Sequence, residues 1–157
     1  MAGVIEVASR FLNGGYVLEE KDINGNITKQ PVLPNVPKTN LQMVVLVNQW
    51  TGSGAEIVAG ALQDAGRAKL IGETTFGTGT VLVTYPLSDG SALSLGIQEW
   101  LTPSGHTIWH TGLTPDTVVS LPTSVTLLFP QAEKGLSQAQ IQSSGDQQLL
   151  DAISSFP

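Results

Sequence analysis

Two apolar runs separated by a helical pattern constrain the fold of this chain more than any other feature. Residues 41–48 (LQMVVLVN) are nearly all apolar, as expected of a strand buried on both faces of a parallel sheet. Residues 68–72 (AKLIG) predict a second buried strand. Between them lies a helical stripe that stops at Gly66 and consists of Ile57, Val58, Ala61, Leu62 and Ala65. This order indicates a βαβ unit with a right-handed crossover.

Alternating patterns on either side of this unit predict two antiparallel hairpins. The first runs through residues 16–20, turns at residues 24–26 and returns through residues 27–32. The second joins residues 80–87 to residues 91–101 through a Ser-Asp-Gly turn. Helices are predicted at both ends, over residues 145–156 and over the N-terminal stretch, whose apolar face would be Val4, Val7, Ala8, Phe11 and Leu12.

Composition narrows the class of protein. The chain has 157 residues, of which 41% are hydrophobic, so it can form one domain with a real core. Its net charge is −6 and its seven basic residues are scattered, which argues against a nucleic-acid partner. Cysteine is absent, so disulfides, thiolate metal sites and a cysteine nucleophile are excluded. No stretch approaches the roughly 20 apolar residues of a membrane helix.

Ser53, between Gly52 and Gly54, sits at the predicted turn from strand to helix. Such a turn presents a hydroxyl beside unpaired helix amides and the positive end of the helix dipole, which suits a nucleophile. The same residues also fit an S-x-x-E capping box with Glu56, a purely structural role. Local sequence alone favours the capping interpretation and leaves both open.

Several motifs occur in the order typical of the carboxyl-terminal processing peptidases, the tail-specific serine proteases. Residues 46–81 (LVNQWTGSGAEIVAGALQDAGRAKLIGETTFGTGTV) are similar to the core of that family, and the likeness continues through residues 87–96, 101–116 and 146–153. The resemblance implies an α/β crotonase-like (ClpP/crotonase) fold core built from ββα units, with a β-hairpin insertion. We expect residues 1–157 to be a single-domain partial core that lacks the family's PDZ domain and its Arg-x-Asn-x-Gly-Gly segment.

The resemblance also implies roles for individual residues. The family's nucleophile falls on Ser53, and the amide of Gly54 would contribute to the oxyanion hole. The family's general-base lysine falls on Thr78, and the glutamine that orients this lysine falls on Leu82. Both of these positions depart from the family pattern.

Because of these two departures, two functional hypotheses have to be considered. Serine is a weak nucleophile until a neighbouring group takes its proton, and threonine cannot do so near neutral pH. The first hypothesis is a serine endopeptidase that acts through Ser53, with its activity in doubt because Thr78 and Leu82 replace the lysine and the glutamine. The alternative is a proteolytically silent peptide-binding or scaffold module. Apart from catalysis, Thr78 is most simply a turn residue that fills space or forms a hydrogen bond.

Other side chains are candidates to replace the missing base. Glu56 and Glu73 are near Ser53 in the sequence, and His106 and His110 are the only imidazoles. The histidines stand four apart in HTIWH, a segment predicted to be a strand, and a third metal ligand is not evident, so neither a metal site nor a cofactor is predicted.

Trp50 lies just before the nucleophile turn and either packs in the core or forms a wall of a substrate cavity. Core packing is the simpler interpretation.

The resemblance implies a polypeptide substrate, cleaved in its C-terminal region, and an extracytoplasmic (periplasmic or cell-envelope) location. Membrane contact by these residues is not expected. Exposed sheet edges predict a possible homo-oligomer.

Overall fold

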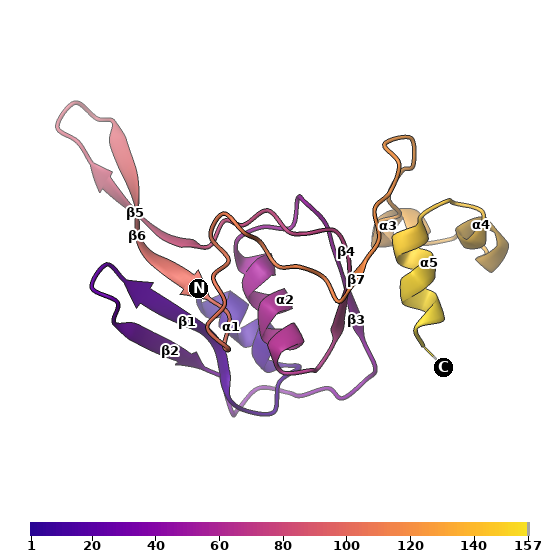
Figure 1. The fold of residues 1–157 in the computed structure, drawn as a ribbon, viewed down its shortest axis with the longest axis horizontal. Helices are drawn as coiled ribbons and strands as arrows, with labels where there is room; N and C mark the ends of the chain where they lie inside the picture. Colours follow the sequence, from indigo (N-terminus) through magenta and orange to yellow (C-terminus); the bar gives the residue numbers. More distant parts are fainter. Residues whose placement is uncertain (157) are drawn as a thin grey trace.

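Helix α2 (Gly54–Asp64) lies between two β-sheets in the computed structural model, which describes residues 1–156 (Figure 1). One sheet is antiparallel, with the strand order β2-β1-β6-β5, and the other is parallel, with the order β3-β4-β7. The strands are β1 (Tyr16–Asp22), β2 (Ile27–Pro31), β3 (Val44–Val47), β4 (Lys69–Gly72), β5 (Thr80–Pro86), β6 (Ala92–Leu101) and β7 (Thr117–Val118).

The predicted βαβ unit is confirmed: β3 and β4 are parallel neighbours joined through α2. The prediction that residues 41–48 are buried on both faces is wrong. Only Val47 is buried in β3, because β3 is an edge strand of its sheet. Strand β4 lies in the centre of the same sheet and buries Leu70 and Ile71.

Both predicted hairpins are present. The first turn is held by Asp22, whose carboxylate accepts hydrogen bonds from the amides of Asn24 and Asn26 and from the Asn26 side chain. The side-chain bond from Asn26 is the main cause that lowers the pKa of Asp22. The strands of this hairpin also carry an ion pair of 2.5 Å between Lys29 and the buried Glu19, which face each other in the β1–β2 register.

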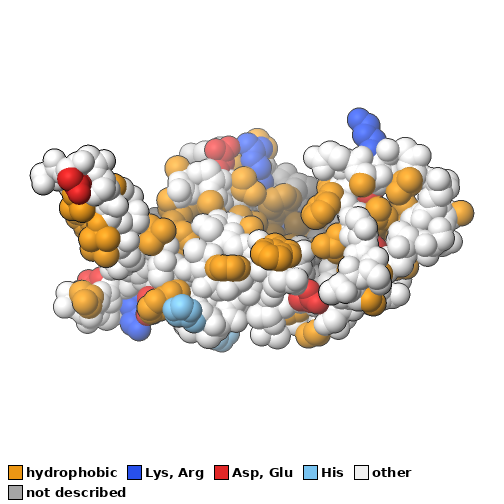
Figure 2. Space-filling model, turned by 90° about the horizontal axis from the view of Figure 1, so that it is seen from above, with side chains coloured by type: hydrophobic (Ala, Val, Ile, Leu, Met, Phe, Trp, Pro, Cys, Tyr) orange, Lys and Arg blue, Asp and Glu red, His pale blue; other side chains and the backbone are white. Residues whose placement is uncertain are grey.

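The second hairpin, β5–β6, projects from the body of the molecule as an arm (Figure 1). Only the last residues of β6, from Gln98 to Leu101, also pair with β1. The outer part of the arm therefore has no second layer against it, and hydrophobic side chains gather on its surface (Figure 2). These exposed residues are Leu82, Tyr85, Leu87, Leu93, Leu95 and Ile97.

The segment HTIWH is not the strand that the sequence predicted. It forms one isolated bridge, between Thr107 and Leu101, and then turns at His110, which has a φ of 59°. The cause is tertiary: the glycine-rich loop 73–79 packs against the backbone of residues 108–112 and leaves no room for a strand neighbour.

Four further helices are present. Helix α1 (Ala2–Ser9) packs against α2 in the core, whereas α3 (Pro130–Glu133), α4 (Gln138–Gln142) and α5 (Gln147–Ser154) form the C-terminal part of the molecule (Figure 1). Helix α5 confirms the C-terminal prediction and begins at Asp146, whose side chain accepts the Leu149 amide. Helix α1 is shorter than predicted: Phe11 and Leu12 follow it, and Val7 is exposed.

Two cations fix the irregular connector of residues 33–42. The ammonium of Lys38 donates to the carbonyls of Ser9, Leu12 and Leu33. It thereby supplies a hydrogen-bond donor to carbonyl groups at and just after the C-terminal end of α1. The guanidinium of Arg67 donates to three further carbonyls, those of Phe11, Thr39 and Leu41. None of the helices formed by residues 1–156 is long and apolar enough to cross a membrane.

Candidate active site

The chain leaves β3 and enters α2 through a sharp turn over residues 48–53. The Asn48 side chain accepts the amide of Trp50, and the hydroxyl of Thr51 accepts the amide of Asn48. At the end of the turn, Ser53 has φ 56° and ψ −125°, a region that residues with a side chain rarely adopt. Ser53 is exposed, so the turn presents its hydroxyl to solvent at the mouth of α2.

Ser53 and Glu56 have the arrangement of a capping box, but only one half of it forms a well-aligned hydrogen bond. The Glu56 carboxylate accepts the Ser53 amide at 2.9 Å. The Ser53 hydroxyl faces the Glu56 amide but does not form a well-aligned hydrogen bond with any helix amide. The amide of Gly54, the first residue of α2, donates to no group in residues 1–156. The Gly54 amide can therefore donate a hydrogen bond to a ligand, and the Ser53 hydroxyl is not held by a strong hydrogen bond.

Glu56 has a larger role than capping. It is fully buried, and four donors surround its carboxylate. One oxygen accepts the amides of Ser53 and Thr78, and the other accepts the hydroxyl of Thr75 and the amide of Gly77. This carboxylate therefore ties the turn at Ser53 to the loop 73–79. The S-x-x-E pattern identified the local bond, but the three bonds to the loop have no local signature.

The glycines around Thr78 allow this loop to lie directly on another backbone. Gly77 and Gly79 have φ values of 84° and 36°. A Cβ atom on Gly77 would lie 2.9 Å from the amide nitrogen of Gly112, and one on Gly79 would overlap the backbone of Trp109. Glycine is required at both positions because the loop packs against residues 108–112.

The structure brings Thr78 to the turn at Ser53, whereas Leu82 lies on β5. The hydroxyl oxygen of Thr78 lies 3.1 Å from the place that a Cβ atom on Gly52 would occupy, next to Ser53. The Thr78 amide donates to Glu56, but any residue other than proline could make this backbone bond, so the role predicted for the threonine side chain stays a prediction. Leu82 lies on β5 opposite Gly96, with its side chain 60% exposed.

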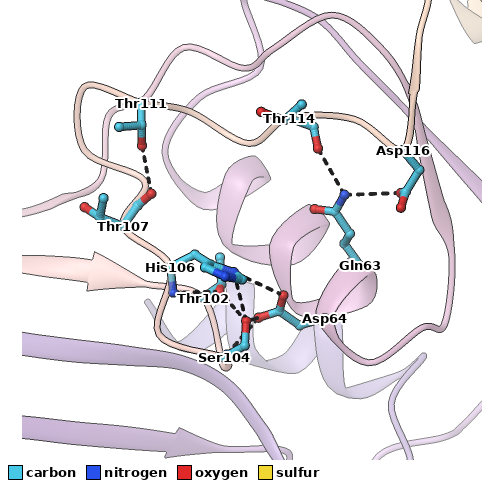
Figure 3. Close-up of polar contacts among 9 residues, drawn as sticks. All are labelled: Gln63, Asp64, Thr102, Ser104, His106, Thr107, Thr111, Thr114 and Asp116. Carbon is cyan, nitrogen blue, oxygen red and sulfur yellow. Dashed lines mark hydrogen bonds and ion pairs between the residues drawn. The ribbon is translucent and has the colours of Figure 1, made fainter.

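Neither histidine takes the place of the missing base in this structure. The His106 ring lies 3.0 Å from the Ser104 hydroxyl and 3.9 Å from Asp64, at the last turn of α2 (Figure 3). Ser53 is at the other end of that helix, about 16 Å away at 1.5 Å per residue. The His110 ring packs against the Trp109 ring at an angle of 37°, and the His110 amide donates to the Gly77 carbonyl.

Carboxylates do not supply a base either. The four hydrogen bonds to Glu56 match the roughly four acceptor sites of a carboxylate, so it has no capacity left for the Ser53 hydroxyl. Over residues 1–156, no titratable side chain is hydrogen-bonded to that hydroxyl. The same residues contain no cluster of three metal-ligating side chains.

Trp50 does not pack in the core. Its side chain is 78% exposed and lines a cavity of about 560 Å³ beside the turn at Ser53, so the core interpretation is wrong, and a substrate-binding role for this wall stays a prediction.

Comparison with known proteins places these features in a family. Residues 1–119 match the family model described as peptidase family S41. The chain is 48% identical over 83 residues to the carboxyl-terminal-processing protease of Picosynechococcus sp. (53% of this chain, 20% of that protein). It is 34% identical over 134 residues to the carboxy-terminal processing protease CtpA of Bacillus subtilis (85% of this chain, 29% of that protein).

Solved structures agree with these relatives. The photosystem II D1 C-terminal processing protease superposes with a TM-score of 0.70 and 32% identity, over 78% of this chain and 33% of that one. A putative S41 protease from Bacteroides fragilis, 18% identical over 89% of this chain and 40% of that one, shares the fold with a TM-score of 0.63. The predicted crotonase-like α/β fold is thereby confirmed. The chain spans about a fifth to a third of the length of these curated relatives.

Proposed function

Because the chain belongs to peptidase family S41, we propose that it is a serine-type peptidase core of the carboxyl-terminal processing kind, with Ser53 as the nucleophile. The observation that carries this proposal is the backbone of Ser53, whose φ of 56° places an exposed serine at the N-terminal end of α2. Backbone strain of this kind is retained where a nucleophile must be exposed on a sharp turn.

The reaction would be acyl transfer. The Ser53 oxygen attacks the scissile carbonyl carbon and gives up its proton, and the carbonyl oxygen becomes negatively charged. The free amide of Gly54 and the positive end of α2 would stabilise that charge. Collapse of this intermediate breaks the C–N bond, the proton given up by Ser53 passes to the leaving nitrogen, and the amine departs. An ester is left on Ser53, which water then hydrolyses. The steps need no metal or organic cofactor.

The weak point of this chemistry is the proton of Ser53. It needs an acceptor, and the resemblance implies that Thr78 occupies the position of the family's lysine. Loss of one member of a serine-protease catalytic set lowers kcat by on the order of 10⁴- to 10⁶-fold. This observation supports a second candidate, a proteolytically silent module that binds peptides in the same place.

Covalent labelling of Ser53 with a fluorophosphonate distinguishes the candidates. We expect slow labelling of the chain, no labelling of Ser53→Ala, and labelling faster by at least about 10²-fold in Thr78→Lys/Leu82→Gln. A chain that labels and cleaves peptide as fast as the double variant would disprove the silent module. A chain that never labels while the double variant does would establish a pseudoprotease.

The substrate and location are part of the proposal. The substrate would be a polypeptide, bound near its C-terminus, and the site of action would be outside the cytoplasm, in the periplasm or the cell envelope. The charge of −6 gives no support for a nucleic-acid ligand. Fractionation of cells that express the tagged protein would test the location.

A further inference from the structure

A cavity of about 560 Å³ separates the nucleophile turn from the C-terminal part of the chain. Its lining is largely apolar and comes from two sides: Leu46 and Trp50 on the β3 side, and Leu127, Leu128, Phe129 and Pro130 on the other. Trp50 and Phe129 are 78% and 61% exposed, so large apolar surfaces face the cavity or solvent without a covering layer. Apolar surface that stays in water favours an apolar ligand.

The cavity lies next to the proposed nucleophile. Trp50 and Thr51, which line it, stand three and two residues before Ser53 in the same turn. The Thr51 carbonyl also accepts the Phe76 amide at 2.8 Å, which fixes this wall to the loop that carries Thr78. A polypeptide held with its backbone at Ser53 can therefore place a neighbouring side chain in the cavity.

The second wall belongs to residues 120–156, which lie beyond the part of the chain that matches the family model. This wall is held in place by buried polar groups. Asp146 accepts the amides of Leu128 and Leu149, and the Gln148 side chain donates to the carbonyl of Val119. Asp146 is only 2% exposed, so the segment 127–130 is anchored through the Leu128 amide to a buried carboxylate.

Charge at the cavity is acidic. Asp146 is occupied by its two amides, whereas the half-buried carboxylate of Glu133 also lines the cavity and forms no ion pair within residues 1–156. An acidic group beside an apolar cavity favours a basic neighbour and repels an acidic one.

We propose that this cavity binds a large apolar side chain of the polypeptide, and that Glu133 selects a basic residue next to it. Phe129 and Glu133 are then residues that determine specificity. The proposal rests on Ser53 marking the place where the polypeptide lies, but it concerns binding and not hydrolysis.

Binding of fluorescein-labelled Gly/Ser peptides with one central pair, measured by anisotropy, tests this proposal. The pairs are Leu-Lys, Leu-Glu and Ser-Lys. The chain should bind Leu-Lys most tightly, and Phe129→Ala should weaken that binding by about tenfold. Glu133→Gln should weaken Leu-Lys by about threefold and remove the preference over Leu-Glu. Ile23→Ala removes an apolar side chain that is even more exposed, from the β1–β2 turn, and should leave the binding of all three peptides unchanged.

The outcomes separate this inference from the proposed function. Equal binding of Leu-Lys and Ser-Lys, unchanged binding in Phe129→Ala, or no binding of any peptide would overturn it. If Ser53 never reacts with the fluorophosphonate while Leu-Lys binds as expected, the nucleophile proposal fails and the cavity assignment stands. Circular dichroism of Phe129→Ala confirms that the wall variant is folded.

Discussion

The carboxylate of Glu56 accepts a hydrogen bond of 2.9 Å from the amide of Ser53, three residues earlier in the chain. The same carboxylate accepts donors from the loop 73–79, so the position of the nucleophile turn and the position of Thr78 depend on one buried anion. The consequences of this arrangement can be measured.

Glu56→Gln should destabilise the chain by about 3 kcal/mol. The glutamine side chain replaces one carboxylate oxygen with an NH2 group, which cannot accept the hydrogen bonds that backbone N–H groups now donate to that oxygen. Urea unfolding gives the free energy, and hydrogen exchange should show faster exchange at the amides of Gly77 and Thr78. Glu6→Gln is the control, because it changes an exposed carboxylate paired with Arg10, and it should lower the free energy of unfolding only slightly. Equal losses in the two variants would contradict the role of Glu56.

Ser53→Gly should stabilise the chain by about 0.5–1 kcal/mol, because glycine adopts a φ of 56° without strain. Thermal unfolding measures the change. Ser137 is the matched control: it begins α4 with an ordinary φ of −73° and a capping bond to Gln140, so Ser137→Gly should lower stability by a few tenths of a kcal/mol. A loss of stability in Ser53→Gly would show that the turn is not strained.

Gly79→Ala should cost more than about 3 kcal/mol, because the new methyl group would overlap the backbone of Trp109. Gly90→Ala introduces the same methyl group at a φ of 87° in open space and should cost only about 1 kcal/mol. Urea unfolding of the two variants separates the steric cost from the conformational one. Similar values would mean that loops 73–79 and 108–112 are not in contact.

The ion pair of Lys29 with Glu19 should make stability depend on pH in the alkaline range. The hydrogen bond from Lys29 to Glu19 is the main cause that raises the pKa of Lys29 above its usual 10.5. A raised pKa in the folded state means that the stabilisation is complete below pH 10.5 and is lost as the pH rises through the folded value.

Lys29→Arg tests this dependence, since arginine stays charged at that pH. Urea unfolding from about pH 9 to about pH 12 should show a steeper loss of stability in the parent chain than in Lys29→Arg. Parallel curves would contradict the assignment.

The β5–β6 arm should cause self-association. Strand β5 is a sheet edge without a charged residue, and uncharged apolar edges pair readily with another copy. Sedimentation velocity over a range of concentrations should show dimers that Leu95→Lys reduces and that Ile23→Lys, on the other hairpin, does not. A single monomeric species at every concentration would contradict this prediction.

The elements of the fold could be predicted from sequence because each has a local cause. The run at residues 44–47, the helical stripe of α2 and the turn chemistry at Asp22 and Gly90 act over short distances. The burial of β3 could not be predicted in this way, because whether a strand is an edge depends on its neighbours in the sheet. HTIWH was mispredicted for a similar reason: its conformation follows from loop 73–79, some 30 residues earlier.

In the candidate site, too, the features with a local sequence signal could be predicted and those that depend on distant residues could not. The S-x-x-E pattern and the flanking glycines predicted the turn at Ser53, while the link from Glu56 to Thr75, Gly77 and Thr78 spans 19 to 22 residues and has no local signal. The cavity that Trp50 lines is likewise completed by the distant segment 127–130, which no local pattern predicts. The roles of Ser53, Gly54, Thr78 and Leu82 stay predictions that the labelling experiment tests.

Lys38 is exposed, yet its ammonium is engaged by three carbonyls that hold the connector in place. An amine-acylating reagent should therefore modify it well after Lys134, and mass spectrometry of a time course would show the delay. Once acylated, Lys38 could no longer gather those carbonyls, so a chemical footprint at this one lysine would report whether the connector is docked or released.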